Sequence, residues 1–151
     1  MDETVRGYAH RIDVHADVNG VWHALTDAHS LTRWCSPRAG IRPRAGGLFR
    51  ASVDRLTELE AHIDIFEPAR RLRLIYLPSP ALPAADSAVI DDLLLEPVAG
   101  GTIVRVLGAG IPSAPEWDVQ YARLRTGWLH ALTRLKVFVE GRAVNTGSAM
   151  T

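Results

Sequence analysis

The sequence predicts an α+β domain in which a curved antiparallel sheet packs against one long helix. Strand-like segments, each bounded by Pro, Gly or Asp, follow one another between residues 48 and 110, and strands in such a succession usually pair as hairpins. Apolar side chains recur every three or four residues over 117–139, which is typical of an amphipathic helix. A helix with one apolar stripe must bury it against a face of the sheet.

Two short helices are predicted between the first strand and the rest of the sheet. Residues 8–14 alternate in polarity and predict the first strand. Asp17 and Asp27 follow at positions where a carboxylate can accept a hydrogen bond from the first turn of a helix. We expect the helices to cover residues 18–25 and 28–34, with their apolar faces inward.

The middle of the chain predicts the strands that build the sheet. Pro37 and Pro43 leave room for no more than a short edge strand in 36–46. The pair Gly100-Gly101 predicts a hairpin between the last two strands. The other expected strands are 48–54, 56–66, 71–77, 88–96 and 102–110.

The C-terminal segment predicts the longest helix. Ser113 and Glu116 have the S-x-x-E spacing of a capping box, which would start this helix. Gly141 follows the last apolar position of the repeat and would end it. We therefore expect one domain over 1–141 and a flexible tail over 142–151.

Composition and charge exclude several classes of function. Seventeen acidic residues balance seventeen basic ones in 151 residues, which disfavours a nucleic-acid-binding domain. The single cysteine, Cys35, excludes an internal disulfide framework and a cysteine-rich zinc site. The six histidines lack the spacing of a metal site, so we expect no metal and no cofactor. No stretch is apolar and long enough to span a bilayer, so we expect a cytoplasmic protein, and one lysine among the basic residues suits a GC-rich bacterial genome.

Several motifs occur in order along the chain and together carry a resemblance. They are A-D-V-N-G-V-W-H-A-L-T-D (16–27), L-T-R-W (31–34), R-P-R-A-G-G-L-F (42–49), F-E-P-A-R-R-L (66–72), L-E-P-V-A-G-G-T (95–102), G-A-G-I (108–111) and G-W-L-H-A-L-T-R-L-K-V-F-V-E (127–140). The chain resembles the SRPBCC superfamily of START-like or birch-pollen-allergen-like proteins. Within it, the chain looks like the group named after the activator of the ninety-kilodalton heat-shock protein ATPase.

This resemblance implies a helix-grip fold and a ligand cavity. In that fold a curved sheet of six to seven antiparallel strands wraps around the C-terminal helix, and two short helices follow the first strand. Two departures touch the expected cavity. Many relatives carry a polar or histidine residue where this chain has Gly108, and Cys35 stands where a second tryptophan often follows Trp34.

A cavity between the sheet and the C-terminal helix is the expected ligand site. Its expected apolar and aromatic lining is Trp34, Phe49, Tyr76, Leu93, Val104, Trp117 and Tyr121. Each of these side chains could equally be plain hydrophobic core. The proline-rich loop 78–87 is expected to close over the cavity as a lid.

His10 and Asp91 are the expected polar groups of the cavity, together with the Tyr121 hydroxyl. Asp91 alternates with Leu93 and Leu95 and should therefore point inward. If it pairs with His10, the two could orient a polar ligand or act as weak candidates for an acid and a base. The alternative is that Asp91 lies at the frayed start of its strand and meets water.

A second polar row remains open between two interpretations. Glu58, Glu60, His62 and Asp64 alternate along one expected strand. Such a row could hold a metal or support acid–base chemistry. It could also be the solvated face of an antiparallel sheet.

Three functions are compatible with the sequence. The first is binding of a small hydrophobic or aromatic molecule between the sheet and the C-terminal helix, by a monomer or homodimer. The second is an enzyme similar to polyketide cyclases or hydrolases, using the His10–Asp91 pair. The third, implied by the resemblance alone, is a chaperone-associated partner protein.

Overall fold

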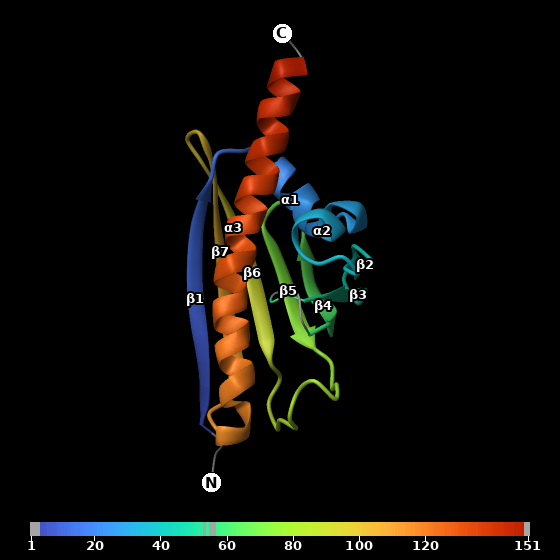
Figure 1. Cartoon of the computed structure of the whole chain (residues 1–151), viewed down its shortest axis with the longest axis vertical. Coiled ribbons are helices and arrows are strands. Elements are labelled where there is room, and N and C mark those ends of the chain that lie inside the picture. The colour runs from blue at the N-terminus through green and yellow to red at the C-terminus, as the bar shows by residue number, and fades with distance from the viewer. Residues whose placement is uncertain (1–3, 53, 55–56, 150–151) are drawn as a thin grey trace.

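A sheet that wraps along one long helix forms the body of the protein (Figure 1). The computed structural model describes residues 4–52, 54 and 57–149, with side chains as far as Arg142. Within this part the strands are β1 (Val5–Val14), β2 (Gly40–Ile41), β3 (Leu48–Ala51), β4 (Leu59–Glu67), β5 (Arg71–Tyr76), β6 (Ile90–Val98) and β7 (Gly101–Pro112). The helices are α1 (Val18–Thr26), α2 (Ala28–Trp34), a 3₁₀ turn (Pro115–Trp117) and α3 (Asp118–Ala149).

The strand order explains how the chain closes around α3. All neighbours pair antiparallel in the order β1-β7-β6-β5-β4-β3-β2. The first strand thus joins the last, while the strands between them follow as a meander. This arrangement confirms the predicted α+β class with a curved antiparallel sheet, one long C-terminal helix and two short helices after the first strand.

The two short helices begin where the sequence predicts. The Asp17 carboxylate accepts a hydrogen bond from the Gly20 amide at 3.0 Å and caps α1. The Asp27 carboxylate accepts one from the Ser30 amide at 2.9 Å and caps α2. Because each cap satisfies an amide that has no partner inside its own helix, both predicted N-termini are confirmed.

Both predicted ends of α3 were wrong. The expected capping box of Ser113 and Glu116 does not form, because the N-cap position is Ala114, and the Ser113 hydroxyl donates to the Thr4 carbonyl at 2.6 Å. A 3₁₀ turn without a side-chain cap precedes α3 instead. Gly141 does not adopt the left-handed conformation of a helix cap, and the helix continues to Ala149. The expected flexibility of 142–151 stays a prediction, and 150–151 lie outside the described residues.

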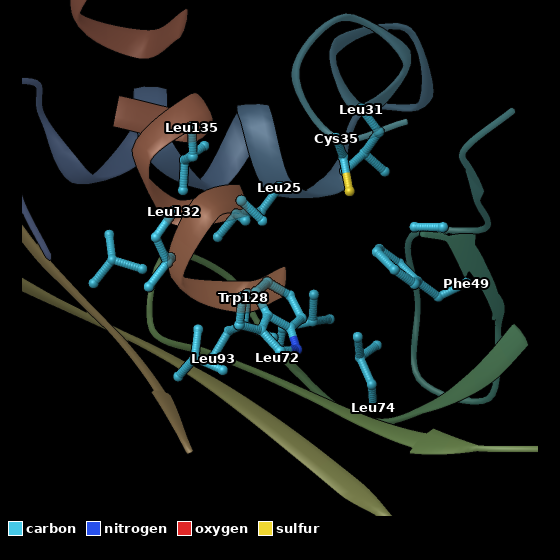
Figure 2. Close-up of a cluster of buried hydrophobic side chains, with 14 of the residues drawn as sticks. Leu25, Leu31, Cys35, Phe49, Leu72, Leu74, Leu93, Trp128, Leu132 and Leu135 are labelled. Carbon is cyan, nitrogen blue, oxygen red and sulfur yellow. The ribbon is translucent and has the colours of Figure 1, made fainter. Parts of the chain in front are cut away.

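The core fills the space between α3, the short helices and the inner face of the sheet. In Figure 2, Trp128 and Leu132 extend from α3 towards Leu72 and Leu93 of the sheet, all nearly inaccessible to solvent. Cys35, at the end of α2, closes the same cluster from the side of the short helices. The expected helical stripe therefore packs as core along most of its length.

The second polar row lies on the outer face of the sheet. Leu59, Ala61 and Ile63 of β4 are buried, while Glu60 and Asp64, which alternate with them, are exposed. These carboxylates lie near arginines of the neighbouring strands, Arg50 at 3.5 Å and Arg73 at 3.7 Å. Glu58 is exposed just before the strand and His62 is half-buried. Because most of the row is exposed, it forms part of the solvated face of the sheet. Among the described residues no group of His, Cys, Asp or Glu could hold a metal ion.

None of the helices in the described part of the chain is long and apolar enough to cross a membrane.

Candidate functional site

A carboxyl group lies fully buried on the inner face of the sheet. Asp91 is the second residue of β6 and is 0% exposed, in the same alternating set as Leu93 and Leu95. The alternative of a frayed strand end that meets water is therefore excluded. Burying a carboxylate is costly unless hydrogen bonds replace its hydration, so its partners decide what this group can do.

Three side chains from three elements donate hydrogen bonds to Asp91. The Tyr8 hydroxyl of β1 donates to Oδ1. The Tyr76 hydroxyl of β5 donates to Oδ2 at 2.5 Å, and the Trp128 indole N–H of α3 donates to the same oxygen at 2.8 Å. We call these four residues the Asp91 cluster. Through the single carboxyl group of Asp91, the cluster connects β1 and β5, which lie on either side of β6 in the sheet, to the long helix α3.

Burial dominates the electrostatics of the cluster. It raises the pKa of Asp91, although the hydrogen bonds from Tyr76, Tyr8 and Trp128 act in the opposite direction. Burial, together with the nearby Asp91 charge, also raises the pKa of both phenols well above the usual range. Tyr8 and Tyr76 therefore remain protonated donors.

A glycine makes the Tyr8 contact possible. Gly108 of β7 pairs with Tyr8 on one side and with Asp91 on the other. A Cβ atom on Gly108 would lie 2.3 Å from Cζ of Tyr8. The missing side chain thus leaves the space through which the Tyr8 ring crosses β7 to reach Asp91.

The structure does not join His10 to Asp91. Nε2 of His10 lies 2.7 Å from the backbone carbonyl oxygen of Arg125, and its ring stacks on Tyr8 with the centroids 5.6 Å apart. The Tyr121 hydroxyl donates to the Gly7 carbonyl at 2.7 Å. The side chains of His10 and Tyr121 therefore hold α3 against β1. Asp91 bonds instead to Tyr8, Tyr76 and Trp128, a pairing that the sequence did not predict.

The space between the sheet and the helices is almost filled by side chains. An enclosed cavity of about 20 Å³ remains. That volume suits about one water molecule, whereas a dry cavity that binds benzene measures roughly 150 Å³. Of the expected ligand residues, Trp34, Phe49, Tyr76 and Leu93 line it, while Val104 is fully buried elsewhere in the core.

A larger open pocket lies beside the loop that joins β5 to β6. Its volume is about 590 Å³, and its lining includes Tyr76 and Trp117. The loop is tied to the start of α3, because the Trp117 indole N–H donates to the Ala84 carbonyl at 3.1 Å. In Figure 1 this loop and the beginning of α3 lie at the same end of the molecule. Its other lining residues are Leu77, Pro78, Ser79, Pro80, Leu82, Pro83, Ala84, Ala85, Ser87, Ala88 and Val89. We call it the loop pocket.

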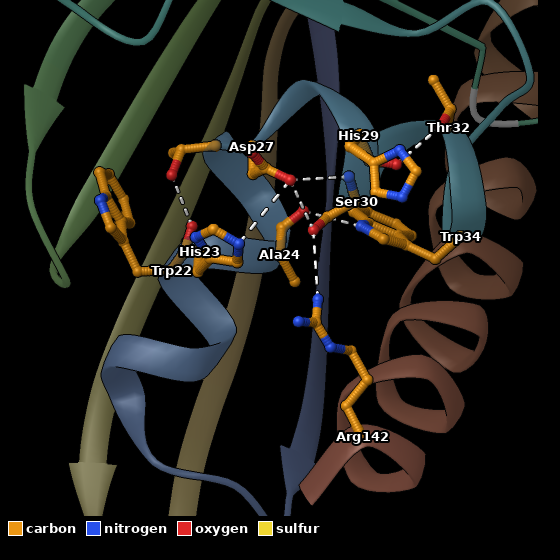
Figure 3. Close-up of polar contacts among 10 residues, drawn as sticks. Trp22, His23, Ala24, Asp27, His29, Ser30, Thr32, Trp34 and Arg142 are labelled. Atoms are coloured by element: carbon orange, nitrogen blue, oxygen red, sulfur yellow. Dashed lines mark hydrogen bonds and ion pairs between the residues drawn. The ribbon is translucent and has the colours of Figure 1, made fainter. Parts of the chain in front are cut away.

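Trp34 has a structural role beside the enclosed cavity. Its indole N–H donates to the Ala24 carbonyl at 2.8 Å and ties α2 to α1 (Figure 3). Arg142 reaches the same region from α3, with Nη1 3.4 Å from the Ser30 hydroxyl. A surface groove of about 430 Å³ lies here between α1 and α3, beside Phe138.

Comparisons with known proteins give a family and a set of shared folds. Residues 15–140 match the profile of the family described as Activator of Hsp90 ATPase homolog 1-like protein. No curated protein sequence matches the chain. Protein MLL2253 from Mesorhizobium loti shares the fold with a TM-score of 0.76 and 22% identity, over 89% of this chain and 97% of that one.

Two further solved structures have the same fold. The Aha1 dimer from Colwellia psychrerythraea gives a TM-score of 0.76 at 19% identity, over 89% of this chain and 96% of that one. CalU16 from Micromonospora echinospora gives 0.70 at 23% identity, over 93% of this chain and 80% of that one. At such identities the likeness shows the fold alone.

Proposed function

Because the chain belongs to the Activator of Hsp90 ATPase homolog 1-like family of the SRPBCC superfamily, we propose that it binds a small, uncharged, mostly apolar or aromatic molecule. The site is the loop pocket, bounded by the segment 77–89, Tyr76 and Trp117. The observation that carries this proposal is an open pocket of ligand size with a neutral, largely apolar lining next to a buried polar cluster.

Size and lining support a small neutral ligand. Small-molecule sites usually measure roughly 300–1,000 Å³, and the loop pocket, at about 590 Å³, falls inside that range. Asp86 is the one charged residue of the loop segment and is not among the lining residues. A charged ligand would lose hydration here without gaining an ion pair, so it would bind poorly.

The hydrogen-bonding groups of the lining favour apolar contact. The prolines have no N–H to offer. The Trp117 N–H is already bonded to the Ala84 carbonyl, and the Ser87 hydroxyl donates to the Gly110 carbonyl at 3.1 Å. Ring faces, proline rings and methyl groups therefore provide most of the surface that a ligand can contact.

The loop is also the proposed lid. A hydrogen bond from Trp117 to the Ala84 carbonyl ties it to the turn before α3, and one from Ser87 to the Gly110 carbonyl ties it to β7. Its side chains Ala81 and Leu82 also pack against the core. Breaking one such bond costs roughly 0.5–1.5 kcal/mol net. Opening the loop therefore costs these two hydrogen bonds and the packing of Ala81 and Leu82, while the sheet and helix stay in place.

A calorimetric titration with 2-naphthol tests the proposal. We expect saturable binding with one site per chain, weakened at least tenfold by Leu82→Glu, because that change brings a charge into the apolar lining. Leu129→Glu is the matched control, since Leu129 is 50% exposed on the outer side of α3. Equal affinity in both variants, or no saturable binding by the wild type, contradicts the proposal.

The other two functions gain less support from the structure. The enzyme alternative needs an acid–base pair, and His10 and Asp91 bond to different partners. The chaperone-partner alternative rests on the family name. A monomer or homodimer stays a prediction, in line with the dimer solved for the Colwellia relative.

A further inference from the structure

Tyr76 separates the loop pocket from the enclosed cavity. Among the described residues it is the one that lines both spaces. The enclosed cavity, at about 20 Å³, is too small for an aromatic ring, whereas the loop pocket can receive a displaced side chain. A ligand that moves inward from the loop pocket must therefore push the Tyr76 ring aside.

Moving Tyr76 has a specific chemical cost. Its hydroxyl donates to Oδ2 of Asp91, which is completely buried from bulk solvent. The Trp128 N–H stays on the same oxygen and Tyr8 stays on the other, so one donor position becomes vacant. Leaving a buried acceptor unsatisfied is more costly than exchanging one donor for another.

We propose that the ligand is a small uncharged aromatic molecule bearing a hydroxyl or N–H donor, and that this donor replaces the Tyr76 hydroxyl on Asp91. Tyr76 then acts as a gate: its side chain occupies the inner position until the ligand, which makes the same hydrogen bond to Asp91, displaces it. The inference rests on the proposed function, because the ligand must first occupy the loop pocket. It narrows the ligand from any neutral aromatic molecule to one that can donate a hydrogen bond.

The chemistry of the cluster excludes other groups at this position. The donors of Tyr8, Tyr76 and Trp128 all point at Asp91, so none of these three hydrogens is free for an acceptor such as a ketone or an ether. A ligand carboxylate would bring a second negative charge next to Asp91 in a dry site. A phenol supplies a ring of suitable size and one donor.

The experiment uses 4-methylphenol, which is the side chain of tyrosine itself. Its matched controls are 4-methylanisole, in which a methyl group replaces the hydroxyl hydrogen, and toluene. Each is titrated into ¹⁵N-labelled protein while the indole N–H signals are followed by NMR. Trp117 reports on the loop pocket and Trp128 on Asp91, because its N–H bonds to the oxygen whose other donor would be exchanged.

We expect 4-methylphenol to shift the signals of both Trp117 and Trp128 and to bind about tenfold more tightly than 4-methylanisole. Tyr76→Phe removes the competing hydroxyl, so both 4-methylphenol and toluene should bind about tenfold more tightly than they bind the wild type, and 4-methylphenol should still bind more tightly than toluene. Tyr121→Phe is the matched control, because its hydroxyl bonds to the Gly7 carbonyl and lines neither space. It should leave all three affinities unchanged.

Three results would overturn the inference, and the first two also distinguish its failure from that of the proposed function. If Trp117 shifts but Trp128 does not, and the phenol has no advantage, the ligand stays in the loop pocket; the gate is then wrong and the proposed function stands. If neither signal shifts with any of the three compounds, both are wrong. Equal affinities of Tyr76→Phe and the wild type would likewise show that the hydroxyl does not hold the gate closed.

Discussion

The ring of Tyr8 lies over Gly108, so close that a Cβ atom there would be 2.3 Å from Cζ of Tyr8. Through this gap the tyrosine of β1 reaches across β7 to the buried carboxyl of Asp91 on β6. The contact depends on a side chain that is missing, and it connects the first strand of the chain to the centre of the sheet.

The first prediction concerns that gap. Gly108→Ala should displace the Tyr8 ring and remove one donor from Asp91, lowering the free energy of unfolding by roughly 2–4 kcal/mol. Gly40→Ala is the control, because a Cβ on Gly40 meets nothing within 4 Å. Urea denaturation measures both. A loss no larger at Gly108 than at Gly40 would show that the ring does not depend on the gap.

The second prediction separates the Tyr8 hydroxyl from its ring. Tyr8→Phe keeps the packing over Gly108 and deletes one donor to the Asp91 carboxyl. Its cost should be roughly 1.5–3 kcal/mol, the range for hydrogen bonds to charged groups. Tyr121→Phe, which deletes a bond to a backbone carbonyl, should cost about 1 kcal/mol or less. If urea denaturation shows the same loss of unfolding free energy for Tyr8→Phe and Tyr121→Phe, the bond to Asp91 is no stronger than one to a backbone carbonyl.

The third prediction is a pH dependence. Burial raises the pKa of folded Asp91 above the ordinary value of 3.8, so the folded state holds this proton to higher pH than the unfolded state does. The contribution of Asp91 to stability is therefore full below about pH 3.8 and decreases as the pH rises towards the raised pKa.

The comparison of the wild type with Asp91→Asn isolates this contribution, because the other acids are the same in both. The unfolding free energy of the wild type minus that of the variant should fall as the pH is raised from about 3.8. A difference that rises over this interval would mean that the folded pKa of Asp91 is lowered.

The fourth prediction tests the attachment of the lid. Trp117→Phe keeps an aromatic ring but removes the N–H that donates to Ala84. Amide hydrogen exchange within 77–89 should become faster by roughly threefold to tenfold, the equivalent of one net hydrogen bond. Trp22→Phe is the control, since Trp22 packs against Phe66 and lines neither space. Unchanged exchange in the loop would show that this bond does not hold it.

The fifth prediction concerns the end of α3. Gly141 lies inside the helix, and a Cβ there meets nothing within 4 Å. Gly141→Ala should therefore stabilise the protein by about 0.5–1 kcal/mol. If Gly141 instead ended the helix as the sequence predicts, alanine would be neutral or destabilising. Thermal unfolding distinguishes the two results.

The fold could be predicted because its signals are local. The alternation in 8–14 and the carboxylates at Asp17 and Asp27 define a strand and two helix starts without reference to the rest of the chain. The predicted capping box was wrong because the partner of Ser113 lies far away in the sequence. The Ser113 hydroxyl is bound by Thr4, more than a hundred residues earlier, and no local pattern reveals such a contact.

The site could be predicted only in part. Alternation places Asp91 inward, but its partner Tyr8 becomes visible only when the register of three strands is known. His10 lies one alternation further along β1 and so meets the backbone of α3 rather than Asp91. The filled space under α3 also depends on how large side chains such as Trp128 pack, which spacing alone does not determine.

The most direct test of the central claim is to locate a bound neutral aromatic molecule by intermolecular nuclear Overhauser effects. With 2-naphthol present, we expect effects between its ring protons and Leu82 and Trp117 of the loop pocket. Effects confined to the groove between α1 and α3, at Phe138 and Val139, or none at saturating ligand, would contradict the account.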